Sequence, residues 1–161
     1  MEARHKSMKA SGDFLADANE QLKIINQPQN YPLFNEKFEE TLGAPLKTGK
    51  IEIFQINLGY MCNMVCKHCH VDAGPDRTEI MTMETLELCL AALKGSDIQK
   101  VDLTGGAPEM NPLFKWFVEE VRKLDKHVMV RSNLTILVTK KFDDYAKFMA
   151  DQNVEIISSL P

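Results

Sequence analysis

Short β-rich runs alternate with helical windows from residue 51 to the end of the chain. Runs rich in β-branched and other apolar residues predict strands over 51–58, 100–104, 127–133 and 154–160. The windows between them carry apolar residues at spacings of three and four, the periodicity of a helix with one buried face. Strands separated by helices in this way predict parallel pairing with right-handed crossovers, so the fold class is α/β.

Residues at the window ends predict where these helices start and stop. Thr82 predicts the N-cap of the first helix and Gly95 its C-terminal stop. Asn111 predicts the N-cap of the second helix, with Pro112 at the first helical position. The third helical window covers 141–152.

Residues 1–50 follow a different pattern. Two amphipathic stretches, 14–25 and 34–42, each place apolar residues on one helical face, and Gly43 ends the second. We therefore divide the chain into a helical N-terminal extension over 1–50 and a βα domain over 51–161. The chain stops on its fourth strand, although parallel sheets are usually covered on both faces, so we expect this βα domain to be truncated there.

Composition narrows the functional classes. At 161 residues with 44% hydrophobic content, the chain can bury one sizeable core. A formal net charge of −4, without any basic run, gives no electrostatic reason to expect nucleic acid. No apolar run approaches the roughly 20 residues of a membrane helix, and the N-terminus lacks the apolar core of a secretory signal. We expect a cytoplasmic protein that binds neither nucleic acid nor membrane.

Three of the four cysteines, Cys62, Cys66 and Cys69, lie in the loop that follows the first predicted strand. In a reducing compartment, such a cluster is more often a metal or redox site than a disulfide framework. Their spacing is C-x3-C-x2-C. Three thiolates can hold three irons of a cubane cluster and leave the fourth iron open, whereas a ferredoxin closes its cluster with four cysteines. Cys89 lies on the apolar face of a predicted helix and is interpreted as a core residue.

Two other metal sites fit part of this loop. The segment 66–70 matches the C-x-x-C-H pattern of covalent haem attachment, but that reading requires export and leaves Cys62 unexplained. A zinc site could combine the three thiolates with His68 or His70 in a tetrahedron. Structural zinc sites usually draw their ligands from two separated pairs, whereas these candidates share one loop.

The three-cysteine spacing after the first strand of an α/β pattern resembles the radical S-adenosylmethionine (radical SAM) superfamily. The resemblance implies a full or partial barrel of βα units and a [4Fe–4S] cluster on Cys62, Cys66 and Cys69. It also implies that S-adenosylmethionine chelates the open iron and is cleaved to methionine and a 5′-deoxyadenosyl radical. A small-molecule substrate and an electron donor such as flavodoxin or ferredoxin follow from the same resemblance.

Polar and glycine-rich residues follow the other predicted strands, at the edge where ligands bind in such folds. Gly105 and Gly106 would allow the backbone to approach a ligand closely, with an ordinary tight turn as the alternative. Asn133, Ser158 and Ser159 are candidate hydrogen-bond partners for the ribose or carboxylate of the cofactor, with strand-end capping as the alternative.

The resemblance extends to the element after the second strand, with two departures. The Gly105-Gly106 pair matches the Gly-Gly-Glu element that holds the methionyl amino group in the superfamily. Here Ala107 stands in place of the glutamate, and Glu109 lies two residues further along. His68 precedes the third cysteine, where a larger aromatic residue often meets the adenine, so we include His68 among the cofactor contacts.

More narrowly, "INLGYMCNMVCKHCHVDAGPDR", "DLTGGAPEMNP" and "RSNLT" together resemble the arsenosugar biosynthesis radical SAM proteins, from about Phe34 to Pro161. This resemblance implies transfer of the 5′-deoxyadenosyl group to a trivalent methylated arsenical. It also implies that further barrel units and a cysteine-bearing C-terminal domain are missing here. The alternatives are a radical SAM enzyme acting on a peptide or another small molecule, and a zinc-binding module without catalysis.

Overall fold

The computed structural model describes residues 6–27, 31–66 and 69–158. One sheet of parallel strands lies at its centre, in the spatial order β1-β2-β3-β4. The strands are β1 (Ile53–Asn57), β2 (Lys100–Thr104), β3 (His127–Arg131) and β4 (Glu155–Ile157). All four predicted strands are confirmed, and three of them are shorter than their apolar runs because pairing stops before the residues of the connecting loops.

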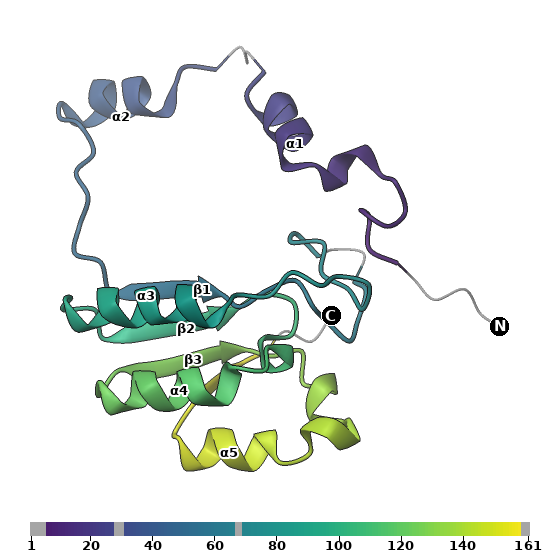
Figure 1. The fold of residues 1–161 in the computed structure, drawn as a ribbon. Coiled ribbons are helices and arrows are strands. Elements are labelled where there is room, and N and C mark those ends of the chain that lie inside the picture. The colour runs from purple at the N-terminus through teal and green to yellow at the C-terminus, as the bar shows by residue number, and fades with distance from the viewer. Residues whose placement is uncertain (1–5, 28–30, 67–68, 159–161) are drawn as a thin grey trace.

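Three α-helices connect successive strands (Figure 1). They are α3 (Met83–Lys94), α4 (Phe114–Lys123) and α5 (Tyr145–Asp151). Short 3-10 turns complete the connections: η2 (Pro108–Met110), η3 (Thr135–Val138) and η4 (Lys140–Phe142). Strands that follow one another in both sequence and space, each joined by a helix, form an arc of a βα barrel. The predicted α/β class with a partial βα barrel is confirmed.

The larger of two buried apolar clusters in the described residues joins the three helices to one face of the sheet. The sheet contributes alternate strand residues, Val101 and Leu103 from β2 among them, while α4 contributes Phe114 and Phe117. All four of these side chains are fully buried. The alternation places every second strand residue on the opposite face, which leaves that face free for polar chemistry.

Two predicted helix starts have different outcomes. Thr82 is the N-cap of α3, where its side chain accepts a hydrogen bond from the Thr85 N–H at 3.4 Å, and Gly95 ends that helix. Helix α4 begins at Phe114, later than predicted, with Leu113 as its N-cap. The Asn111 side chain still accepts a hydrogen bond from the Leu113 N–H at 2.9 Å, as a capping residue does, and it also binds the backbone of the loop described below. The third window forms α5 only from Tyr145 onward, after η4.

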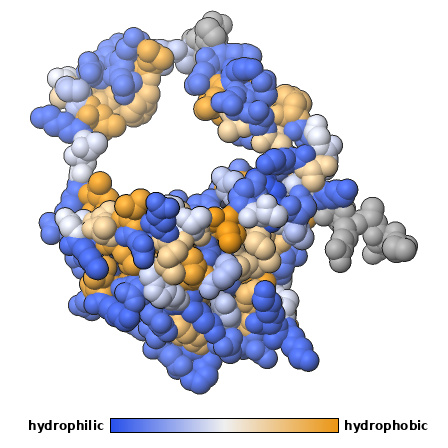
Figure 2. Space-filling view, viewed as in Figure 1, coloured by the Kyte–Doolittle hydropathy of each residue, from blue (hydrophilic) through white to orange (hydrophobic). Residues whose placement is uncertain are grey.

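The N-terminal part contains η1 (Phe14–Ala16), α1 (Ala18–Ile25) and α2 (Phe34–Leu42). Both amphipathic stretches are therefore helical, and Gly43 ends α2 with a left-handed φ of 70°. Neither helix has a buried residue. Figure 2 shows their apolar side chains at the surface, and Phe34 is 67% exposed. None of the described helices is both long and apolar enough to cross a membrane.

Candidate functional site

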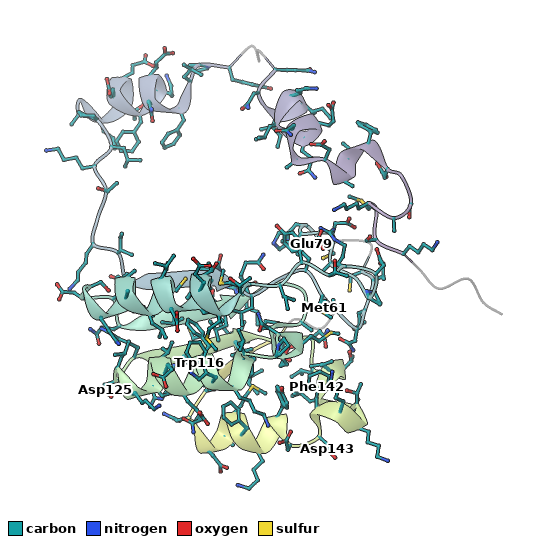
Figure 3. All side chains as sticks on the ribbon, viewed as in Figure 1. Met61, Glu79, Trp116, Asp125, Phe142 and Asp143 are labelled. Atoms are coloured by element: carbon teal, nitrogen blue, oxygen red, sulfur yellow. The ribbon has the colours of Figure 1, made fainter. Side chains whose placement is uncertain are left out.

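The cysteine loop, residues 58–81, leaves β1 and returns to α3 (Figure 3). Its two ends lie side by side, through an antiparallel bridge of Gly59 with Ile80 and a parallel bridge of Met61 with Gly74. The Cys62 N–H donates to the Gly74 carbonyl at 3.2 Å. The loop is therefore closed at its base, and the segment after Cys62 forms an excursion beyond the carboxyl end of β1.

Asn111 holds both ends of this loop. Its Nδ2 donates to the carbonyl oxygens of Leu58 and Met81, each at 3.0 Å, and its Oδ1 accepts from the Leu113 N–H at 2.9 Å. The side chain is 2% exposed. A buried amide with satisfied groups fixes backbone position more specifically than apolar packing does. Sequence reasoning assigned Asn111 to a helix cap and missed this role.

Arg77 holds the excursion from within. Its guanidinium is 9% exposed and donates to the Asp72 carbonyl at 2.6 Å and to the Glu79 carboxylate at 3.1 Å. It also lies over the Tyr60 ring, 4.8 Å from the ring centroid. The hydrogen bonds from Arg77 hold the pKa of Glu79 far below its usual value. A planar guanidinium has five N–H donors on three nitrogens, so Arg77 can bind a backbone carbonyl and two carboxylates at once in a fixed geometry.

The structure places the three predicted cluster cysteines in this loop as free thiols. Cys62 is 6% exposed at the closed base, while Cys66 and Cys69 are half-buried on the excursion. Over residues 6–27, 31–66 and 69–158, no three His, Cys, Asp or Glu side chains come close enough together to hold a metal ion. The loop thus gathers the thiols in one segment without arranging their sulfurs around a common point.

The surroundings of the sulfurs fit a thiolate-bound cluster. The Cys62 sulfur lies 3.5 Å from both the Met64 N–H and Asn133 Nδ2, and the Cys69 sulfur lies 3.3 Å from the Ala73 N–H. Hydrogen bonds to cysteine sulfur are one of the means by which proteins set the reduction potential of iron–sulfur clusters. Burial raises the pKa of Cys62, and the two hydrogen bonds to its sulfur oppose that shift. Soft thiolate donors suit iron–sulfur clusters and zinc.

Gly105 and Gly106 lie against the cysteine loop itself. The Gly106 N–H donates to the Gly59 carbonyl at 2.9 Å, and the next N–H donates to the Met61 carbonyl at 2.8 Å. A Cβ at position 106 would lie 2.4 Å from the Met61 carbonyl oxygen. Gly105 has a φ of +140°, which side chains rarely allow. The sequence predicted close approach to a ligand, whereas the structure shows close approach to the loop backbone.

Glu109, two residues after the Ala107 that replaces the expected glutamate, is buried in the structure. It is 0% exposed in η2, and neither carboxylate oxygen accepts a hydrogen bond from the described residues. Burial raises its pKa. A buried carboxylate without a hydrogen-bond partner is unusual, because burying an unpaired polar group is costly.

Of the remaining predicted cofactor contacts among the described residues, the structure places only Asn133 at the cysteine loop. Asn133, after β3, donates to Asn63 at 2.9 Å in addition to its contact with the Cys62 sulfur, so it lies at the cysteine loop. Ser158 is exposed after β4. His68 and Ser159 lie outside the described residues.

A polar network that sequence reasoning missed crosses the face of the sheet opposite the helices. Asp102, 2% exposed, accepts from Gln55 at 2.7 Å and from two guanidinium nitrogens of Arg131, the closer at 2.8 Å. Arg131 itself is half exposed. The signal was present in the sequence, because Gln55, Asp102 and Arg131 are polar residues beside apolar ones in their strands.

The model of the radical SAM superfamily matches residues 56–158, more than half of the chain. The chain therefore belongs to the radical SAM superfamily. Members of this superfamily use a [4Fe–4S] cluster and S-adenosylmethionine, and the thiols, N–H donors and strand-end position described above fit that cluster.

Among its curated relatives, a probable GTP 3′,8-cyclase of Pyrococcus horikoshii is 33% identical over 75 residues, which is 47% of this chain and 23% of the relative. A GTP 3′,8-cyclase of Alkaliphilus oremlandii is 27% identical over 97 residues, covering 57% and 30%. A 7-carboxy-7-deazaguanine synthase of Clostridium acetobutylicum is 32% identical over 73 residues, covering 45% and 32%. The chain spans less than one third of the length of these relatives.

Proposed function

We propose that this chain carries the cofactor-binding part of a radical SAM enzyme and that Cys62, Cys66 and Cys69 hold its [4Fe–4S] cluster. One observation supports this most directly: three free thiols share a loop at the carboxyl end of the first strand of a partial βα barrel. Bound there, the cluster supplies the electron that breaks a carbon–sulfur bond of S-adenosylmethionine. The electron comes from a donor such as flavodoxin or ferredoxin, in a cytoplasm that keeps the thiols reduced.

The chain's own residues have distinct roles in this proposal. Asn133 and the Met64 N–H donate to the Cys62 sulfur and so stabilise its thiolate form. The Gly106 N–H helps to keep the loop closed onto β2. From the resemblance, we propose that the backbone of Gly105 and Gly106 also receives the methionyl end of the cofactor. His68 and Ser159 remain proposed cofactor contacts on the strength of the resemblance.

For the substrate, we propose a trivalent methylated arsenical, as in arsenosugar biosynthesis. The support is the "TGGAPE" element together with the segments around Cys62 and Asn133. The overall change balances without net oxidation: the C5′–S bond of S-adenosylmethionine breaks and a C5′–As bond forms. Methionine leaves, and the positive charge passes from sulfur to arsenic.

A purine-type substrate is a second candidate, favoured by the names of the relatives. Two of those described above are GTP 3′,8-cyclases and the third is a 7-carboxy-7-deazaguanine synthase. In this alternative the cofactor and its cysteine ligands are unchanged, and only the molecule that reacts with the adenosyl group differs. The half-exposed Arg131 on the open face of the sheet suits such a substrate, because a guanidinium recognises planar acceptor groups well.

Cys66→Ala tests the cluster assignment against Cys89→Ala as the matched control. After anaerobic reconstitution with iron and sulfide, we expect Cys66→Ala to lose the bound iron while Cys89→Ala keeps the iron content of the parent chain. Cys89 is a partly buried core thiol on α3, so its loss removes a cysteine without touching the loop. Equal iron in all three proteins would exclude Cys66 as a ligand.

A second assay separates the substrates. The reduced, reconstituted chain is incubated with S-adenosylmethionine and either a trivalent methylated arsenical or GTP, and the products are identified by mass spectrometry. The main proposal predicts an adenosylated arsenical and methionine in equal amounts. A modified guanine nucleotide, with no arsenic-containing product, would support the purine alternative.

A further inference from the structure

Residues 6–13, here called the N-terminal strap, are hydrogen-bonded to the cysteine loop. The Asp72 carboxylate accepts from the backbone N–H groups of Met8 at 2.6 Å and Lys9 at 2.9 Å. The Asp76 carboxylate accepts from the Ser7 hydroxyl at 2.5 Å and from its N–H at 3.2 Å. These contacts join segments more than 60 positions apart, so they are tertiary rather than local.

The burial of Ser7 shows that the strap is built into the fold. Ser7 is 0% exposed, although the described chain begins only one residue earlier. The strap also closes on itself, because the Ser11 N–H donates to the Ser7 carbonyl at 3.0 Å. Asp72, which binds the strap, is itself held in place within the loop, because Arg77 donates to the same carboxylate at 3.1 Å. The hydrogen bonds that Asp72 and Asp76 accept from the strap involve ionised carboxylates, and such bonds are stronger than those between neutral groups.

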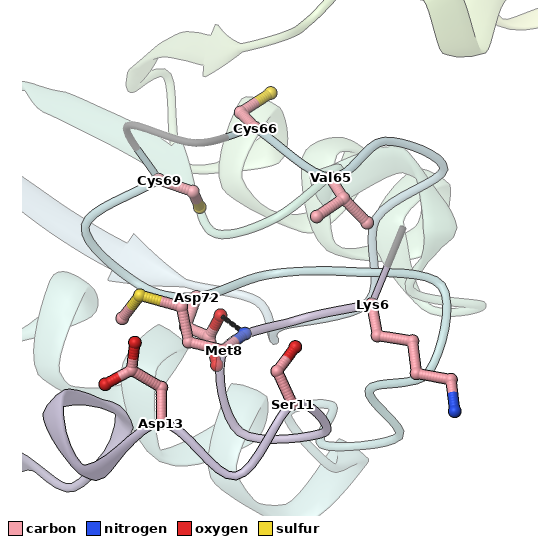
Figure 4. A pocket seen from close by; sticks show the side chains of 8 residues that line it. All are labelled: Lys6, Met8, Ser11, Asp13, Val65, Cys66, Cys69 and Asp72. Carbon is pink, nitrogen blue, oxygen red and sulfur yellow. Dashed lines mark hydrogen bonds between the residues drawn. The ribbon is translucent and has the colours of Figure 1, made fainter. Parts of the chain in front are cut away.

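A cavity of about 380 Å³ lies between the strap and the loop. Its lining residues are Lys6, Met8, Ser11 and Asp13 from the strap, and Val65, Cys66, Cys69 and Asp72 from the loop. In Figure 4 the Cys66 side chain points away from the strap, and Cys69 lies between Cys66 and the strap residues. The strap thus forms one side of a space that Cys66 and Cys69 also line.

We propose that the strap is the outer wall of the cluster site and sets which molecules reach Cys69. This inference rests on the proposed function, because the cavity matters only if these thiols hold the cluster. The wall admits molecules that fit between strap and loop and keeps out larger ones. Larger oxidants, chelators and thiol reagents therefore reach Cys69 only when the strap detaches.

Ser7→Asp tests the proposed wall without substituting any residue of the cysteine loop. It places a second carboxylate against Asp76 at a buried position, where like charges repel strongly and the hydroxyl donor is lost. The metal-free, reduced full chain is treated with a bulky maleimide, and modification of each cysteine is followed by mass spectrometry. We expect the modification rate at Cys69 to rise by about tenfold, because a protected group reacts through local opening. The rate at Cys66 should rise less.

Three comparisons make this result specific. Ala10→Asp adds the same charge to the strap at an exposed position and should leave all rates unchanged. Cys89, on α3, is the internal reference in every sample. The double variant Ser7→Asp with Asp76→Ser exchanges hydroxyl and carboxylate and should restore part of the protection at Cys69. With small iodoacetamide in place of the maleimide, the effect of Ser7→Asp should be much smaller.

Two results would overturn the strap's role. One is an unchanged Cys69 rate in Ser7→Asp, and the other is an equal rise at Cys69 and Cys89, which would mean general loosening. Either failure leaves the cluster assignment standing, because the assay contains no metal. Conversely, the proposed function would fail if the chain never bound iron. The strap could still slow modification of Cys69 in that case, so the two failures can be told apart.

Discussion

The helix-covered side of the sheet and the cysteine loop adjoin each other, yet different forces hold them. On the helix side, fully buried apolar side chains such as Phe117 and Leu103 pack in one core, and burial of apolar area dominates their stabilisation. In the loop, polar groups hold the backbone: Asn111 binds both loop ends, and Arg77 binds a carbonyl and two carboxylates.

This difference has a physical meaning for a site that must receive an inorganic cluster. Apolar packing tolerates many arrangements of similar volume, whereas hydrogen bonds require particular donors at particular positions. A loop that must hold thiols and backbone N–H groups in defined positions therefore relies on polar contacts. We expect it to open more easily than the core, because it buries fewer apolar side chains.

The largest expected effect is on the helix side. Phe117→Ala removes a fully buried ring and should lower the free energy of unfolding by about 3–5 kcal/mol. Leu88→Ala, a control on the exposed face of α3, should change it by less than about 0.5 kcal/mol. Urea denaturation followed by circular dichroism measures both. Similar values for the two variants would mean that the core is not packed as described.

Gly106→Val should act mainly on the loop. Its side chain would collide with the Met61 carbonyl, and overpacking of this kind costs about 1–3 kcal/mol. We expect reconstituted iron to fall together with binding of S-adenosylmethionine. Gly95→Ala is the control, because a Cβ there meets nothing closer than 3.8 Å. Normal iron content with weakened cofactor binding alone would favour the sequence-based view that Gly106 serves the ligand directly.

The smallest effect should come from Asn111→Ala. It removes the two hydrogen bonds that hold the loop ends and a third with the Leu113 N–H, a loss of about 1–2 kcal/mol, and removes no apolar side chain from the core. Amide hydrogen exchange should accelerate at Met81, whose N–H bonds across the loop base, and stay unchanged at Val130 in β3. The exposed Asn19 provides a control substitution. Equal acceleration at both amides would show that loop and core open as one unit.

The fold was predictable where apolar periodicity reports burial. Strand β2 has the predicted bounds, and the caps of α3 at Thr82 and Gly95 follow from local chemistry. The same periodicity correctly predicted the helices α1 and α2. It did not predict whether their apolar faces are covered, and in the structure neither helix has a buried residue.

The site was predictable only in part, because its supports are long-range. The cysteine spacing is a local signal and located the loop. By contrast, Asn111 and Asp72 act on segments far from them in sequence, so no window around either residue reveals its partner. The sequence correctly indicated that the double glycine permits a close backbone approach. It could not show that the approaching group is the Met61 backbone, which only folding brings near.

The most direct test of the cluster assignment is electron paramagnetic resonance of the anaerobically reconstituted, reduced chain, recorded with and without S-adenosylmethionine. The account predicts a [4Fe–4S] signal that changes shape when the cofactor is added, because three cysteines leave one iron open to it. A signal that is unaffected by S-adenosylmethionine, or a colourless protein that retains zinc and no iron, would contradict it.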